Sequence, residues 1–165
     1  MTATTITLPA PTLGPLTLRR VTLSAGVIDE HAGEMFRFGY CHLLTCALHE
    51  LTQLPITTLD CPREGNFLHS GVVTPDNRFW DINGRRTFDE VHASYTGPCV
   101  PSHVLRRVTG PAAMTALFEA YTDRLLPFSV QARDWWKHVL PPVGTNLVVA
   151  FATALQAGTV TRRCA

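Results

Sequence analysis

The sequence predicts an α+β domain in which a helix is followed by a β-hairpin and then by several helices. Residues 40–53 carry apolar side chains at the helical period. Residues 67–82 contain two strand-like runs around a turn, and residues 109–158 contain helical runs separated by prolines. This order does not alternate strand with helix, so we expect no parallel βαβ sheet. We expect one domain over residues 1–165.

The composition indicates a packed interior. Apolar residues make up 45% of the 165 residues and charged residues only 16%, which is unlike a disordered chain. The formal net charge of +1 does not indicate a nucleic-acid partner. No apolar run reaches the ~18 residues that span a bilayer, so no membrane partner is expected. The N-terminus has no basic segment followed by an apolar run. We therefore expect a cytoplasmic protein, unless a dedicated secretion system exports it.

The N-terminal part reads as extended chain. Residues 1–23 are rich in threonine and proline, with apolar alternation at residues 5–8 and 16–23. Proline is tolerated at sheet edges, so this stretch predicts an arm and edge strands. Ser24 is the predicted N-cap of a helix over residues 25–36.

The clearest helix is predicted over residues 40–53. It follows Gly39, and Leu44, Leu48 and Leu51 form one apolar stripe at the helical spacing. Pro55 ends it. A strand or loop over residues 57–64 comes next.

The strongest β signal lies between residues 67 and 82. Runs at residues 67–74 and 78–82 flank Pro75-Asp76-Asn77, whose residue types suit a tight turn. Asn83-Gly84 ends the second arm of this hairpin.

The rest of the chain, beyond a loop at residues 96–102, is predicted to be helical. Thr87 and Glu90 have the spacing of a capping box for a short helix over residues 88–94. The further helices, each bounded by Pro or Gly, are predicted over residues 109–126, 129–140 and 146–157. Residues 109–158 form the helical part of the domain.

Cys41 lies in the first turn of the clearest helix. The unpaired backbone N–H groups and the positive end of the helix dipole favour a thiolate there. A backbone N–H at the same helix start could stabilise an oxyanion. The sequence therefore offers Cys41 as a candidate nucleophile.

His69 and Asp81 are the candidate partners of Cys41. A hairpin centred on Pro75 sets His69 opposite Asp81, on the same face of two antiparallel strands. A carboxylate beside an imidazole sets its tautomer and leaves the other ring nitrogen for a nucleophile. We predict a catalytic Cys41–His69–Asp81 triad.

At these residues the sequence resembles the papain-like cysteine hydrolases in the broad sense, which includes peptidases, deubiquitinase-like enzymes, transglutaminases and acyltransferases. The resemblance covers residues 39–84, the candidate catalytic core, and rests on three motifs: Gly39-Tyr40-Cys41-His42-Leu43-Leu44, His69-Ser70-Gly71-Val72-Val73 and Asp81-Ile82-Asn83-Gly84. It implies a papain-like core, with the cysteine at a helix N-terminus packed on a small antiparallel sheet. No oxyanion donor is assigned, because residues 34–37 lack the glutamine that peptidase members carry before the nucleophile.

The resemblance implies a cysteine-dependent hydrolase or acyl-transfer enzyme that acts through a thioester. Peptidase, deubiquitinase-like, deamidase and transglutaminase-like activities all fit. We expect a protein or peptide substrate and no cofactor. The alternative is a non-enzymatic binding, adaptor or inhibitor protein of phage or plasmid type. The adjacent Trp135 and Trp136 favour that alternative, because aromatic pairs anchor interfaces.

A metal site is a further alternative. His42, Cys46 and His49 share one helix face, with Cys61 nearby in the chain, and zinc accepts such ligands. The chain has no C-x-x-C pair, and we expect no metal. The five cysteines, odd in number and irregular in spacing, indicate no closed disulfide framework and no partner for Cys61.

Overall fold

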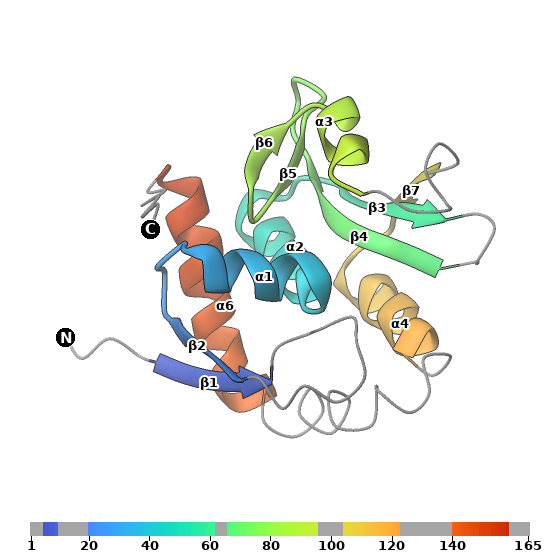
Figure 1. Ribbon diagram of the computed structural model, residues 1–165. Helices are drawn as coiled ribbons and strands as arrows, with labels where there is room; N and C mark the ends of the chain where they lie inside the picture. The colour runs from blue at the N-terminus through green and yellow to red at the C-terminus, as the bar shows by residue number, and fades with distance from the viewer. Residues whose placement is uncertain (1–4, 10–19, 62–65, 96–103, 123–139, 159–165) are drawn as a thin grey trace.

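The computed structural model describes residues 5–9, 20–61, 66–95, 104–122 and 140–158. Within these ranges the chain forms five helices, a two-stranded sheet and a five-stranded antiparallel sheet (Figure 1). The mixed α+β class predicted from the sequence is confirmed. Trp135, Trp136 and the predicted helix over residues 129–140 lie outside the described residues, apart from Leu140.

The larger sheet has the strand order β6-β5-β4-β3-β7. Its strands are β3 (Ile56–Cys61), β4 (Asn66–Val73), β5 (Phe79–Asp81), β6 (Gly84–Arg86) and β7 (Val104–Val108). Neither β6 nor β7 was predicted from the sequence. Both are short edge strands that carry adjacent arginines, so neither has an apolar run, and each is defined by its pairing with β5 or β3.

The β4–β5 hairpin has a different register from the predicted one. Val72 pairs with Trp80 and Val73 with Phe79, so the turn centres on Asp76 instead of Pro75. The prediction that His69 lies directly opposite Asp81 was therefore wrong by two residues. An even shift keeps every side chain on its face of the sheet, so the two residues still share a face.

Helix α2 (Cys41–Thr52) lies at the centre of the molecule (Figure 1). It packs against β4 on one side and against α1 (Glu30–Phe38), α4 (Pro111–Thr122) and α6 (Leu140–Gln156) elsewhere. Leu44 and Leu48 are buried as predicted. Leu51, predicted to be on the same stripe, lies in the last turn of α2 and is 40% exposed, so that prediction was wrong.

Two helix starts differ from the predicted ones. Helix α1 begins after Asp29, whose Oδ1 accepts a hydrogen bond from the Ala32 N–H at 2.9 Å, whereas Ser24 ends strand β2 (Arg20–Ser24), which pairs with β1 (Thr5–Pro9). Helix α6 begins at Leu140, before the two prolines expected to end a preceding helix. The first turn of a helix tolerates proline, because the N–H groups there have no partner within the helix.

Other predicted signals hold. Helix α3 (Phe88–Ala93) has the complete capping box of Thr87 and Glu90, with each side chain bonded to the backbone of the other residue. Helix α4 starts at Pro111, two residues after the predicted start at residue 109, and its first position is the proline. Among the described helices, none combines the length and the apolar character needed to cross a bilayer.

Cys61 contradicts the expectation that it has no partner. It is disulfide-bonded, whereas Cys41 and Cys46 are free thiols. Linear spacing could not indicate the bond, because it depends on which segments the fold brings together.

Candidate active site

The three predicted triad residues come from α2, β4 and β5. Cys41 is the first residue of α2, His69 lies in β4 and Asp81 ends β5. The ladder between β4 and β5 ends at the Val72–Trp80 pair, so His69 and Asp81 lie just beyond it. The side chains are buried, with exposed fractions of 5% for Cys41, 0% for His69 and 2% for Asp81.

His69 and Asp81 form a buried hydrogen-bonded pair. The distance from His69 Nε2 to Asp81 Oδ2 is 2.7 Å. This bond uses one ring nitrogen and leaves Nδ1 for the thiol. Among the described residues, Nδ1 has no partner with ordinary hydrogen-bond geometry, yet Cys41 acts on the pKa of His69 by hydrogen bonding and by charge. We infer a loose contact between sulfur and nitrogen, of the kind that often tightens only with substrate.

Asp81 is held by further donors. Its Oδ1 accepts the Asn83 N–H at 2.8 Å, and its Oδ2 also accepts Arg86 Nη2 at 2.6 Å. Burial raises the pKa of Asp81, but His69, Arg86 and Asn83 together lower it below its ordinary value. The carboxylate therefore remains ionised and fixed in orientation beside the imidazole.

The pKa values of His69 and Cys41 shift toward an ion pair. Burial lowers the pKa of His69, but the hydrogen bond to Asp81 and the contact with Cys41 raise it to about 9. Burial raises the pKa of the Cys41 thiol, and the hydrogen bonds and charge from His69 and Ser70 outweigh that effect, so the pKa is lowered overall. The arrangement favours thiolate beside imidazolium.

The start of α2 leaves donors near the sulfur. Its N-cap, Tyr40, makes no side-chain hydrogen bond to the first turn. The Leu43 N–H bonds to the Tyr40 carbonyl at 3.1 Å. The earlier N–H groups of a helix have no partner within it, so they can serve an anionic sulfur or an oxyanion.

Aromatic rings line the face of the sheet that carries His69. The ring centroids of Phe79 and Tyr95 lie 5.8 and 5.3 Å from that of His69. A Cβ on Gly71 would lie 2.5 Å from Phe79 Cε1 and 2.7 Å from the Trp80 carbonyl oxygen. Only glycine therefore fits at this position, where the Phe79 ring lies across β4.

Sequence reasoning missed four residues of the site: Thr45, Ser70, Arg86 and Tyr95. Ser70 and Thr45 are bonded to each other beside Cys41, and Arg86 bonds to Asp81. A signal existed for Ser70 and Thr45, since one follows His69 in the chain and the other is one helical turn from Cys41. No local pattern indicates Arg86 or Tyr95.

The predicted alternative ligands of a metal are engaged elsewhere. The His42 ring stacks on Phe118 with centroids 3.5 Å apart, and burial lowers its pKa to about 3. His49 Nδ1 lies 2.7 Å from the Leu54 carbonyl oxygen, and Cys61 is in a disulfide. Within the described ranges, no three His, Cys, Asp or Glu side chains converge in a way that could hold a metal ion.

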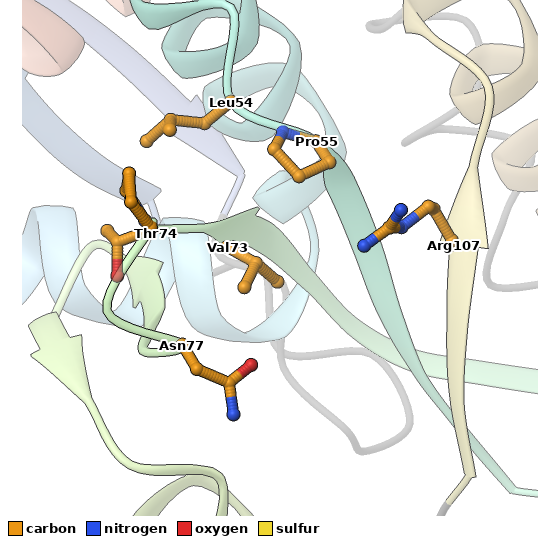
Figure 2. Close-up of a pocket in the computed structure, with 7 residues that line it drawn as sticks. Leu54, Pro55, Val73, Thr74, Asn77 and Arg107 are labelled. Carbon is orange, nitrogen blue, oxygen red and sulfur yellow. The ribbon is translucent and has the colours of Figure 1, made fainter.

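A surface depression lies away from the triad. It has a volume of about 300 Å³ and is lined by residues that include Pro55, Val73 and Arg107 (Figure 2). It lies beyond the C-terminal end of α2, whereas Cys41 is at the N-terminal end.

No protein-family model, curated protein or solved structure matches this chain.

Proposed function

We propose that the protein is a papain-like cysteine hydrolase or acyl-transfer enzyme, with Cys41 as nucleophile, His69 as general base and acid, and Asp81 as the orienting carboxylate. The observation that carries the proposal is the buried His69–Asp81 hydrogen bond of 2.7 Å, which leaves the other ring nitrogen to Cys41. A nucleophile, a base and a group that orients the base are the parts that covalent acyl transfer needs.

Acylation would begin with attack of the Cys41 thiolate on a carbonyl carbon. The carbonyl oxygen becomes an oxyanion, which backbone N–H groups at the start of α2 would stabilise. The His69 imidazolium then gives its proton to the leaving amine or alcohol as the bond to the carbonyl carbon breaks. The products of this step are a thioester on Cys41, a neutral leaving group and a neutral imidazole.

Deacylation would use the same groups in reverse. His69 takes a proton from water or from an amine, which attacks the thioester carbonyl and releases the thiolate. Water gives hydrolysis and an amine gives acyl transfer. Asp81 keeps the imidazole in one orientation through both steps.

The resemblance to papain-like enzymes supports a protein or peptide as the substrate class. The disulfide at Cys61 indicates the kind of compartment in which such an enzyme would act. Disulfides persist mainly in oxidising compartments, so the bond favours the exported alternative over the cytoplasmic one.

A small activated ester tests the proposal without knowledge of the substrate. Incubation with p-nitrophenyl acetate should leave one acetyl group on the Cys41 peptide, which mass spectrometry locates. Hydroxylamine should remove this group, because it cleaves thioesters. We expect His69→Ala to slow acetylation by about 100-fold or more, because the base is lost. Asp81→Asn should slow it less than His69→Ala does, because the imidazole remains but is poorly held.

His42→Phe is the matched control for that experiment. His42 is as buried as His69 and is the next residue after Cys41, but it stacks on Phe118 instead of joining the triad. This variant should acetylate at the parent rate. Acetylation of Cys46 in preference to Cys41, or equal rates in the parent and His69→Ala, would contradict the proposal and favour the binding-protein alternative.

A further inference from the structure

Two buried hydroxyl groups form a chain beside the candidate nucleophile. Thr45 Oγ1 donates to the Cys41 carbonyl oxygen at 2.8 Å and lies 2.9 Å from Ser70 Oγ. Thr45 and Ser70 are each only 1% exposed. Through Thr45 the Ser70 hydroxyl lies beside Cys41, and hydrogen bonding from the hydroxyl and the backbone N–H of Ser70 lowers the pKa of the Cys41 thiol. The chain thus runs from the sulfur through Ser70 to Thr45 and back to the Cys41 carbonyl.

The number of protons in this chain restricts its arrangement. A hydroxyl has one proton to donate. Since Thr45 donates to the Cys41 carbonyl, its oxygen must accept from Ser70. The Ser70 proton then points away from the sulfur, and Ser70 can only accept from the S–H. This orientation suits a thiol and leaves a lone pair facing a thiolate.

The chain has a second orientation that suits the thiolate. Ser70 turns its proton to the sulfur, and Thr45 turns its proton to Ser70. The Cys41 carbonyl loses the Thr45 hydroxyl but keeps the backbone N–H of the following helical turn, so it is not left unpaired. Ionisation therefore gains one charge-assisted hydrogen bond, from Ser70 to the thiolate, and loses two neutral ones, from the thiol to Ser70 and from Thr45 to the Cys41 carbonyl.

We propose that the Ser70 and Thr45 hydroxyls form a two-orientation proton chain that determines how readily the Cys41 thiol ionises. Ser70 stabilises the thiolate, whereas Thr45 competes for the Ser70 proton and stabilises the thiol. The two residues are positioning residues that act through the nucleophile. The inference rests on the proposed function only because that function makes Cys41 the nucleophile.

The other ionisable groups around the sulfur stay constant across the test. They are His69 on β4, Tyr95 after α3 and Cys46 on α2, with Asp81 and Arg86 behind His69. Substitution of Ser70 or Thr45 removes no charge. A change in the titration of Cys41 would therefore report the hydroxyl chain.

The experiment is the pH profile of iodoacetamide alkylation at Cys41, followed by mass spectrometry of its peptide in the folded full chain. The midpoint of the profile reports ionisation and is independent of the access of the reagent. Ser70→Ala should raise the midpoint by about one pH unit, since a hydrogen bond to the thiolate is lost. Thr45→Val should lower it by up to about one unit, since Ser70 is then free to donate to the sulfur.

Thr52→Val is the matched control. Thr52 lies on the same helix and makes the same type of bond, from Oγ1 to the Leu48 carbonyl oxygen, but away from the thiol. It should leave the midpoint unchanged. If Thr45→Val or Ser70→Ala does not fold, Thr45→Ala or Ser70→Gly removes the same hydroxyl.

Shifts in opposite directions support the chain whatever the parent midpoint. Shifts in the same direction, or no shift in either variant, would overturn it. An ordinary parent midpoint near ~8.5 would instead count against the proposed nucleophile, so failure of the two proposals can be told apart.

Discussion

Cys41 and Cys46 are free thiols on the same helix, but their surroundings act on them in opposite ways. Burial raises the pKa of both groups. At Cys46 no group among the described residues opposes burial, which together with the charges of Glu50 and Cys41 raises the pKa to about 12. At Cys41 the contacts with His69 and Ser70 reverse the sign. The contrast shows that burial in this helix produces an inert thiol unless specific partners are present.

His42 and His69 repeat the contrast for imidazole. Both are fully buried. Burial lowers the pKa of His42 to about 3, so it stays neutral and packs as an aromatic ring against Phe118. At His69 the Asp81 carboxylate raises the pKa to about 9 despite the same burial. His69 is therefore held as one member of a charged pair, whereas His42 is held by aromatic packing.

The largest expected effect is the alkylation contrast between the two thiols. At pH 7 iodoacetamide should modify Cys41 faster than Cys46 by a factor on the order of 100, because thiolate abundance outweighs the lower nucleophilicity of a more acidic thiol. His69→Ala should reduce this ratio to below about 10, since only the hydrogen bonds from Ser70 then oppose the effect of burial on the Cys41 pKa. Quantitative mass spectrometry of both peptides measures it. His42→Phe should keep the parent ratio, and similar rates at both thiols in the parent would break the comparison.

The second effect is a pH dependence of stability that comes from His69. Its pKa is raised from 6.5 to about 9, so its stabilisation is complete below pH 6.5 and is lost as the pH rises through about 9. A Cys41→Ala background removes the opposite contribution of the thiol, and it also removes the Cys41 contacts that help to raise the His69 pKa. In this background the stability lost between pH 6.5 and 9 should be smaller in His69→Gln, by less than the ~3 kcal/mol that corresponds to the full shift. Urea unfolding of both proteins at several pH values measures this loss. A difference in stability between them that stays constant from pH 6 to 9 would contradict the charged form of His69.

The smallest effect concerns Gly71, where the Phe79 ring lies across β4 next to the site. Gly71→Ala should destabilise the fold by about 1–3 kcal/mol, because its Cβ meets the Phe79 ring and the Trp80 carbonyl within 2.7 Å. Gly33→Ala is a matched control, since a Cβ there meets nothing within 4 Å. Thermal unfolding compares the two variants. Equal stability in both would show that the Phe79 ring is not held against β4.

The candidate site could be predicted in part because its signals are local. Cys41 begins a helix whose period is visible in the chain, and a tight turn brings the strands of His69 and Asp81 together. The register was predicted two residues away from the observed one, yet the shared face survived, because side chains alternate with a period of two. The turn residues alone did not decide where the turn is centred.

What the sequence by itself determined is the α+β class, the helix that begins at Cys41, the hairpin and the capping box of Thr87 and Glu90. Each depends on residues within a few positions of one another. Only the tertiary structure decided the edge strand β7, the disulfide at Cys61 and the contacts of Arg86 and Tyr95 with the site. Apart from the Arg86–Asp81 bond, which spans five residues of the β5–β6 hairpin, these contacts join segments that are distant in the chain. They depend on packing of the whole fold, which no local periodicity encodes.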